Sequence, residues 1–299
     1  MKKFLLHSAL FLIPVVVALV ALECVLRQMP NPYKSKCEWM NQHASTVQTL
    51  VLGNSHTFYG VQPQYLDGEA YNLANVSQTL REDCYLLTHW ADDYKQLQTV
   101  IVPIAYCTLF EDLEHSTESY RCRYYSIYMD CDLYPCLPQY HLEVADISSA
   151  MAKLKRDTGV DWDQWGWGTA YKLANKSQQQ WDNHTEAIAS AQRHTIDDWS
   201  LLDANVQLLD SIATFCEQRH IRLVLITTPC WSDYYTRLDH KQLQQMYATL
   251  RTLQQQHPTV QYLDYMRDPR FTADDFYDSN HLSNRGSQKF TTLLNDTIK

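Results

Sequence analysis

Residues 46–56 read Thr46-Val47-Gln48-Thr49-Leu50-Val51-Leu52-Gly53-Asn54-Ser55-His56. The first part of this stretch is rich in β-branched and apolar residues, which favours a strand that ends at Gly53. In a doubly wound sheet, ligands bind beyond the carboxyl ends of the strands. We therefore expect the turn after the first strand to expose the hydroxyl of Ser55 above the edge of the sheet.

Beyond this turn, short β-rich runs alternate with helical stretches. We expect further strands over residues 69–74, 100–105, 221–226 and 260–263, and helices over 79–94, 197–219, 238–255 and 283–298. Such alternation is typical of a mostly parallel sheet that helices cover on both faces. The sequence therefore predicts an α/β fold with a doubly wound, mostly parallel five-stranded sheet, in one domain over residues 46–299.

Residues at about 109–196 do not fit this alternation, and we expect an insertion or cap there, helical over 146–156. The segment is rich in aromatic side chains. These include six tyrosines over residues 120–140, then Trp162, Trp165 and Trp167. Aromatic rings with polar rims could stack on sugar faces. Packing between a cap and its domain is the commoner role of such a cluster, and both interpretations stay open.

The N-terminus combines a short basic head, Lys2 and Lys3, with an apolar run over residues 4–22 that Glu23 and Arg27 close. The nineteen residues of this run make a helix of about 28 Å, just enough to cross a hydrocarbon core. Such a segment is a membrane anchor or a secretory signal peptide. Because the chain stays apolar beyond the candidate cleavage site, an uncleaved anchor is favoured.

This anchor comprises residues 1–27 and is expected to contact the lipid bilayer through residues 4–26, while residues 28–45 are predicted as a linker. Basic residues favour the cytoplasmic side of a membrane span. The two lysines therefore predict a single-pass membrane protein with a cytoplasmic N-terminus. The domain that follows is expected outside the cytoplasm, in the periplasm or on the cell surface.

Composition excludes some functions and leaves others open. The formal charge is −9, which argues against nucleic acid as a partner because phosphate binding needs a basic surface. Eight of the nine cysteines follow the anchor, where disulfides are permitted. Disulfides among Cys122, Cys131 and Cys136 and buried free thiols are equally compatible with this clustering. No Cys-x-x-Cys pair or histidine-rich ligand spacing occurs, so we expect neither a metal site nor a cofactor.

The far end of the chain supplies candidate partners for Ser55. A serine becomes a nucleophile beside a base, usually a histidine that a carboxylate orients. Asp278 and His281 lie between the last strand and the last helix, and their i, i+3 spacing places both on one side of a helical turn. The carboxylate could then hold the imidazole while the second ring nitrogen faces Ser55. Taken alone, the turn at Ser55 or the turn with Asp278 and His281 is more often a helix cap or a surface ion pair.

Together, in this order along an α/β chain, the two halves resemble the SGNH (GDSL-like) hydrolases. That family has its serine in a Gly-Asp-Ser turn after the first strand and its base in an Asp-x-x-His-Leu motif near the C-terminus. The resemblance covers about residues 46–299 without the insertion, and the C-terminal motif is the more specific half. It implies the flavodoxin-like fold of the family and a catalytic triad of Ser55, Asp278 and His281.

The resemblance also implies where the oxyanion donors lie. The family's second block is similar to residues 72–79, in which Ala74 and Ser77 occupy the two glycine slots. The backbone N–H groups of Ser55 and Ser77 are then the expected donors. The family's third block has an asparagine after the third strand, whereas this sequence has no asparagine between Asn75 and Asn175.

Four further residues are candidate contacts to the substrate or the oxyanion. Asn54 stands where the family has an aspartate, which keeps the shape of the side chain and loses the charge. His56 follows the serine and either lines the site or packs against the domain. Tyr106 lies at the exit of the third strand. Trp231 lies in the loop after the fourth strand, on the same edge of the sheet.

The resemblance implies an extracytoplasmic serine enzyme that cleaves or transfers acetyl-sized O-acyl groups on an envelope glycan or a similar acceptor, through an acyl-serine. The anchor and the altered oxyanion block are similar to the family's envelope acyl-transfer members, which work beside a multi-pass membrane acyltransferase. An acylated glycan and such an acyltransferase are therefore the implied partners, and hydrolysis and transfer stay open. The alternative is a catalytically weak or inactive glycan-binding protein, which the missing asparagine favours and the retained triad opposes.

Overall fold

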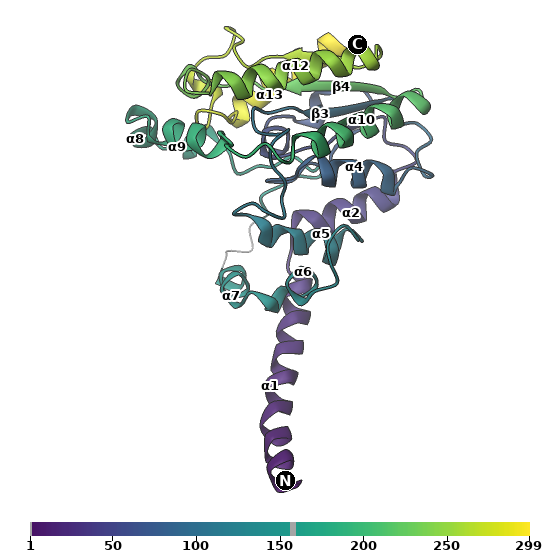
Figure 1. Cartoon of the computed structure of the whole chain (residues 1–299), viewed down its shortest axis with the longest axis vertical. Coiled ribbons are helices and arrows are strands. Elements are labelled where there is room, and N and C mark those ends of the chain that lie inside the picture. Colours follow the sequence, from purple (N-terminus) through teal and green to yellow (C-terminus); the bar gives the residue numbers. More distant parts are fainter. Residues whose placement is uncertain (1, 156–159) are drawn as a thin grey trace.

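The computed structural model of the chain describes residues 2–155 and 160–299 (Figure 1). In this part of the chain, five parallel strands form one sheet in the order β2-β1-β3-β4-β5. The strands are β1 Thr49–Val51, β2 Ala70–Asn72, β3 Thr99–Pro103, β4 Arg222–Thr227 and β5 Gln261–Asp264. This is the flavodoxin-like order of doubly wound sheets. The predicted fold class is therefore confirmed.

The strands divide their apolar side chains between two cores, because successive residues of a strand point to opposite faces. Leu50, Val100 and Leu223 are in register on three adjacent strands and belong to the larger core. The next residues, Val51 and Ile101, belong to the smaller core on the other face. The central strands are therefore buried on both faces, as parallel strands usually are.

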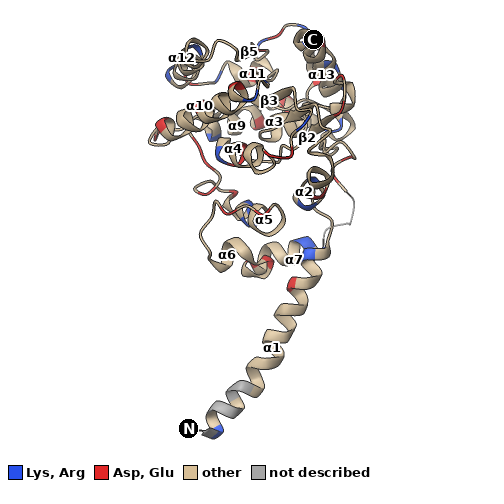
Figure 2. Cartoon of the chain, turned by 90° about the vertical axis from the view of Figure 1, so that its right-hand side faces the viewer, with Lys and Arg blue, Asp and Glu red and all other residues tan. Residues whose placement is uncertain are grey.

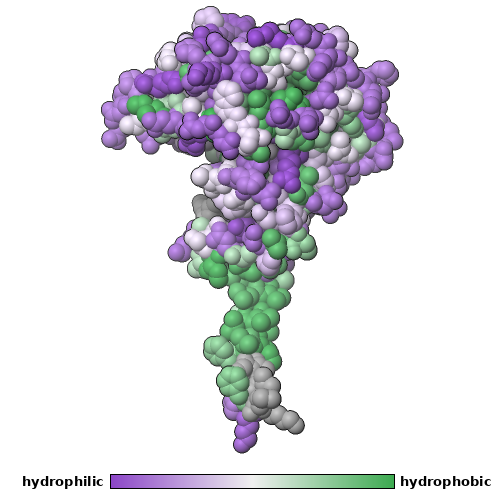
Figure 3. Space-filling model, in the orientation of Figure 1, coloured by the Kyte–Doolittle hydropathy of each residue, from purple (hydrophilic) through white to green (hydrophobic). Residues whose placement is uncertain are grey.

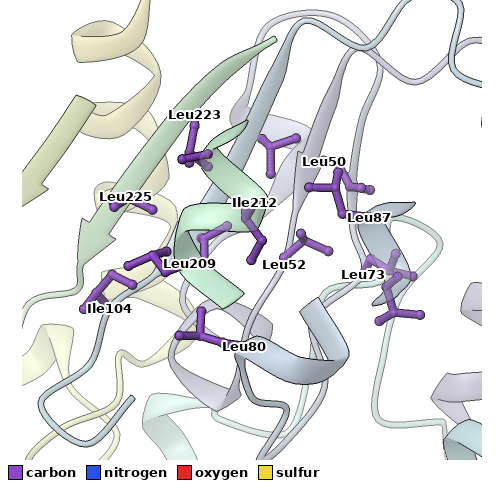
Figure 4. Close-up of a cluster of buried hydrophobic side chains, with 14 of the residues drawn as sticks. Leu50, Leu52, Leu73, Leu80, Leu87, Ile104, Leu209, Ile212, Leu223 and Leu225 are labelled. Atoms are coloured by element: carbon purple, nitrogen blue, oxygen red, sulfur yellow. The ribbon is translucent and has the colours of Figure 1, made fainter. Parts of the chain in front are cut away.

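Helices cover both faces of the sheet. The helix α13 Asn284–Ile298 packs on the face of the smaller core. The larger core is covered by α2 Pro32–His43, α4 Leu80–His89, α10 Leu202–Gln218 and α12 His240–Gln256. Figure 4 shows side chains of α4 and α10, including Leu87 and Ile212, meeting those of the strands. Full burial of each such side chain stabilises the fold by about 1.5–3 kcal/mol.

Apolar spacing and a capping box explain where two of these helices form. Helix α10 buries Leu209, Ile212, Ala213 and Cys216, which is the spacing of one helical face. Helix α4 is shorter than the predicted 79–94, because it ends at His89. It begins after Thr79, whose side chain forms a capping box with Glu82; the box satisfies two backbone groups of the first turn.

The helix α1 Lys2–Gln28 projects from the rest of the molecule (Figure 1). Its acidic and basic residues lie near its two ends (Figure 2), and its described surface between them is apolar (Figure 3). The stretch Leu10–Gln28 is long and apolar enough to cross a membrane, a criterion that a signal sequence near the N-terminus also meets. The predicted apolar helix at the N-terminus is therefore confirmed.

The segment 28–45, predicted as a linker, contains the packed helix α2. Asn31 caps it by accepting a hydrogen bond from the N–H of Lys34 at 2.8 Å, and Pro32 occupies the first turn. Tyr33 and Met40 are buried in the larger core. The prediction missed this helix because its mean composition is polar and only two of its apolar residues, seven positions apart, are fully buried.

The predicted insertion is mostly short helices. They are η2 Ser119–Arg121, α5 Cys122–Tyr128, α6 Pro138–His141, η3 Glu143–Ala145, α7 Ile147–Lys155, η4 Leu173–Asn175, α8 Gln178–Asp182 and α9 Thr185–His194. Helix α7 matches the helix predicted over 146–156, whose last residue, Arg156, lies outside the described residues. The shorter elements elsewhere are α3 Ser55–Phe58, η1 Pro63–Tyr65, α11 Ser232–Tyr235 and η5 Ala273–Asp275.

Much of the aromatic block packs inside the protein. The ring of Tyr33 in α2 lies 5.1 Å from that of Tyr124 and 5.0 Å from that of Tyr125. The indole N–H of Trp167 donates to the carbonyl of Tyr59 at 2.7 Å, just beyond α3. All nine cysteines lie in the described residues and are free thiols, with Cys122 and Cys131 buried. The disulfides considered for residues 122–136 are therefore not formed in this structure.

Gly53 joins β1 to α3 with a φ of +104°, a region that side chains other than glycine rarely adopt. A Cβ at this position would overlap the ring of Pro103 at the end of β3. We therefore expect Gly53→Ala to lower the free energy of unfolding by about 2–4 kcal/mol. Urea unfolding of the full chain in detergent, followed by tryptophan fluorescence, measures this change. Ser211→Ala, at an exposed position of α10, is the control, and an equal effect of both variants would contradict the prediction.

Candidate active site

The carboxyl end of β1 places Ser55 at the start of a short helix. Asn54 is the N-cap of α3, and its side chain accepts a hydrogen bond from the N–H of His56 at 3.0 Å. The Gly53 N–H donates to the carboxylate of Asp83 in α4 at 2.8 Å. Asn54 therefore shapes the turn. Ser55 is partly exposed at the first helical position, as predicted from the sequence.

The structure brings Ser55, His281 and Asp278 together. Ser55 Oγ lies 2.8 Å from His281 Nε2. The other ring nitrogen, His281 Nδ1, lies 2.9 and 3.0 Å from the two carboxylate oxygens of Asp278. With Nδ1–H donating to the carboxylate, Nε2 carries the lone pair that can accept the serine proton. The three side chains thus form a continuous hydrogen-bonded chain.

Asp278 is held in its ionised form. Burial raises the pKa of this carboxyl, but the adjacent His281 and hydrogen bonds from the N–H groups of Asn280 and His281 outweigh burial and lower the pKa overall. These N–H groups lie 3.1 and 2.8 Å from Oδ1. A carboxylate that is both charged and fixed in place sets the orientation and tautomer of the imidazole.

The turn that carries Asp278 and His281 is clamped from two sides. Glu186 of α9 accepts the Ser279 N–H at 2.8 Å, and the N–H of Trp231 donates to the Ser279 carbonyl at 2.8 Å. Helix α13 then begins immediately after the turn, with Ser283 as its N-cap. Sequence reasoning missed Glu186, because nothing in a polar insertion helix indicates which distant turn its carboxylate contacts.

His56 lies against the imidazole of His281. The two rings stack with centroids 4.9 Å apart and planes 24° apart, and His56 Nδ1 is 3.2 Å from Thr228 Oγ1. Burial is the main reason why the pKa of His56 lies well below its ordinary value, and His281 and His194 lower it further. His56 is therefore a neutral, buried ring that supports His281 from one side.

Three tyrosines form a second wall beside His281. Tyr171, from the insertion, stacks on Tyr59 and Tyr277, with ring centroids 3.7 and 4.2 Å apart. Its ring also meets His281 edge to face at 5.2 Å. Sequence reasoning missed this stack, because its members are more than 100 residues apart. The insertion therefore contributes directly to the surroundings of the triad.

The loop expected to supply the second oxyanion donor runs beside the nucleophile turn, since the N–H of Asn75 donates to the Gly53 carbonyl at 3.1 Å. Ser77 adopts a φ of +59°, the left-handed conformation that glycine favours. Its hydroxyl donates to Glu118 at 2.6 Å, a bond that helps to hold a serine in this conformation. The glycine-like backbone is thus kept without the glycine.

A buried lysine supports this loop from behind. Lys36 of α2 is fully buried, and its Nζ donates to the carbonyl of Ala74. The same group lies 4.3 Å from the centre of the Phe58 ring in α3. Burial lowers the pKa of Lys36 well below its usual value, with Asp163 opposing the shift. Lys36 therefore links α2 to both the oxyanion loop and the nucleophile helix.

The two remaining sequence candidates differ in their surroundings. The Tyr106 hydroxyl is 3.2 Å from Thr195 Oγ1 and accepts the Asp239 N–H at 2.9 Å. It thus joins α9 to the start of α12 and is occupied within the protein. Trp231 is half-buried beside the catalytic turn, and its ring lies 5.3 Å from that of Trp181 in α8. Trp231 therefore stays a candidate for a substrate wall.

Two further features lie apart from the triad or are missing from the described residues. Within residues 2–155 and 160–299, no three His, Cys, Asp or Glu side chains are arranged to hold a metal ion. A cavity of about 490 Å³ lies beyond β5 and is lined by Asp264, Arg267, Asp268, Pro269 and Arg270. None of these residues belongs to the triad. The candidate active site is therefore the edge of the sheet at Ser55 and His281.

No protein-family model and no curated protein matches the chain. Matches to solved structures are distant. A protein from Streptococcus pneumonia, provisionally named a platelet activating factor, is 12% identical over 97% of this chain and 99% of its own, with a TM-score of 0.44. A provisionally named acylhydrolase from Bacteroides fragilis is 12% identical over 87% of this chain and 93% of its own, with a TM-score of 0.40. The functional assignment therefore rests on the geometry of the site.

Because His56 is neutral in the folded protein, stability should depend on pH. Below about pH 6.5 the unfolded chain binds a proton at this residue that the folded chain does not bind. As the pH decreases from 6.5 toward the folded pKa of His56, this group should therefore lower the free energy of unfolding by about 1.4 kcal/mol per pH unit. We expect His56→Gln to reduce the slope by that amount in urea unfolding between pH 6.5 and 4.5. Equal slopes for both proteins would contradict a buried neutral ring.

Proposed function

We propose that the chain is a membrane-anchored serine enzyme of the SGNH type that acts on O-acyl esters. The observation that carries this proposal is the hydrogen-bonded chain from Ser55 Oγ through His281 to Asp278, with distances of 2.8 and 2.9 Å. A serine, a histidine and an ionised carboxylate in this geometry form a nucleophile with its general base. The anchor, α1, places the domain outside the cytoplasm in this proposal.

The reaction has two steps. Ser55 Oγ attacks the acyl carbonyl while His281 takes the serine proton, and the resulting oxyanion is held by the backbone N–H groups of Ser55 and Ser77. The tetrahedral intermediate expels the alcohol, which receives the proton from His281, and leaves an acyl-serine. Water or another hydroxyl then attacks this ester with His281 again as the base, releasing the acid or the transferred ester and restoring Ser55.

The aromatic surroundings support a glycan ester as the substrate class. Trp231 and Trp181 are partly buried rings beside the turn that carries His281, and Lys176 Nζ covers one face of Trp181, 3.1 Å from the ring centre. Rings with polar rims suit stacking on sugar faces. An acylated envelope glycan is therefore the proposed substrate, and a multi-pass membrane acyltransferase is the proposed source of acyl groups if the enzyme transfers them.

A second candidate function is glycan binding without turnover. It is favoured by the missing asparagine of the family's oxyanion site, because losing one such donor typically costs about 100- to 1,000-fold in turnover. The glycine-like backbone of Ser77 supports the enzyme instead, since it keeps a donor in the second block. Reactivity of Ser55 separates the two functions.

We expect a fluorophosphonate probe to label Ser55 in the purified full chain, because His281 makes its hydroxyl nucleophilic. Ser55→Ala should abolish labelling, and Asp278→Asn should lower p-nitrophenyl acetate hydrolysis by about 1,000- to 10,000-fold by releasing the imidazole from its required tautomer. Ser211→Ala, on the exposed face of α10, is the matched serine control. An unlabelled wild-type protein, or equal labelling of Ser55→Ala, would leave only the binding function.

Trp231→Ala should raise KM for an O-acetylated oligosaccharide by about 10-fold, because loss of a stacking contact of about 1–1.5 kcal/mol weakens binding by that factor. The KM for p-nitrophenyl acetate should change little, and Trp231→Phe should restore part of the glycan affinity. Equal effects on both esters would show that the Trp231 ring supports the turn that carries His281 instead of binding the glycan. In the same assay, turnover that rises when an unacylated oligosaccharide is added assigns transfer rather than hydrolysis.

A further inference from the structure

Five apolar side chains of the insertion are exposed where it surrounds the end of α1. They are Leu137, Leu142, Ile147, Met151 and Leu154, which are 45, 37, 58, 43 and 39% exposed. The last three follow the i, i+4, i+7 spacing of one face of α7, while Ala150, at the edge of this face, is buried. A short helix with one exposed apolar face is typical of a segment that lies in a membrane interface.

Hydrogen bonds fasten this part of the insertion to α1. The carboxylate of Glu23 accepts the N–H of Val144 at 2.9 Å and the N–H of Glu143 at 3.2 Å. Arg27 donates to the carbonyl of His141 at 2.7 Å. The backbone of residues 141–144 is therefore fixed beside the point where the apolar run of α1 ends.

The length of α1 sets the height of this contact. Lys3 and Glu23 are twenty residues apart, so the helix rises about 30 Å between them, which equals the thickness of a hydrocarbon core. With Lys3 at one interface, Glu23 and the backbone bonded to it lie at the other. Figures 1 and 2 place α6 and α7 at this end of α1, between the apolar helix and the sheet domain.

We propose that residues 137–154, which we call the membrane foot, lie in the lipid interface beside α1 and hold the domain at a fixed height above the bilayer. The inference rests on the proposed role of α1 as a membrane anchor. In the assembled protein, Ile147, Met151 and Leu154 insert between lipid headgroups and acyl chains. The foot adds a second membrane contact to the single span, which limits rotation of the domain about its anchor.

Two observations favour lipid over a protein partner. Apolar surface of α1 continues onto the neck of the molecule where the foot lies (Figure 3). The main charges of the foot are paired within the protein, with Lys153 Nζ 2.6 Å from Glu143 and Arg123 Nη2 3.3 Å from Asp146. Attraction to anionic lipid or to a charged partner is therefore weak, and burial of apolar side chains drives the contact. Zwitterionic phosphatidylcholine should suffice.

The insertion that contains the foot also contacts the turn that carries Asp278 and His281. Its first half contacts α1, and its second half supplies Tyr171 beside His281 and Glu186 beneath the turn. A foot seated in the interface would therefore fix the distance and direction of the active site relative to the membrane. Such an arrangement suits a substrate held at a set height in the envelope.

Site-specific photo-crosslinking tests the proposal. The photoreactive residue p-benzoylphenylalanine replaces Met151 in the full chain, which is reconstituted in phosphatidylcholine nanodiscs, irradiated and analysed by intact mass. We expect a phospholipid adduct at Met151, at a yield at least about half that of the same substitution at Val16 in α1. Ile188 in α9 is the matched control. Its apolar side chain is 39% exposed, close to the 43% of Met151, but it lies beside the sheet domain. It should give less than about one-tenth of that yield.

Each outcome decides a different point. Labelling at Val16 without labelling at Met151 overturns the foot and leaves the anchor in place. No lipid adduct at Val16 overturns the anchor, and the foot with it, while the serine chemistry of Ser55 is untouched. Equal adducts at Met151 and Ile188 show contact without orientation and overturn the foot. In native membranes, a polypeptide adduct at Met151 in place of lipid assigns this face to a protein partner.

Discussion

The hydrogen bond between Ser55 Oγ and His281 Nε2, 2.8 Å long, is the interaction on which the proposed function depends. It joins residues 226 positions apart, so it depends on the tertiary fold that brings the two ends of the domain together. Parallel strands make this possible, because the carboxyl ends of β1 and β5 open onto the same edge of the sheet. Gly286 lets the start of α13 approach the Asp275 backbone so closely that a Cβ would overlap it.

The insertion helps to hold the hydrogen bond between Ser55 and His281 in place. Glu186 and the backbone of Trp231 hold the two sides of Ser279, and Tyr171 closes one flank of His281. Neutral His56 closes another flank. A base that is enclosed in this way keeps one orientation, and such preorganisation is what general-base catalysis requires. The aromatic block thus combines packing with a surface that faces the site.

Sequence patterns predicted the sheet because buried parallel strands are short apolar runs, and helices such as α10 carry apolar residues at regular spacing. The Asp-x-x-His turn could also be predicted from the sequence, since its two side chains are close along the chain. Helix α2 was missed because it is mostly polar, and Lys36 because a buried lysine has no sequence signature. Tyr106 was placed at the strand exit correctly, yet its hydroxyl bonds with Thr195 and Asp239.

The sequence by itself determined the order of strands and helices, the apolar helix at the N-terminus, and the identities of Ser55, Asp278 and His281. These features depend on residue type and local spacing, which a linear chain displays directly. Only the tertiary structure decided which side chains surround the triad, how Ser77 adopts a glycine-like backbone, and where the insertion meets α1. Such contacts join residues far apart in the chain, and their geometry follows from packing of the whole domain.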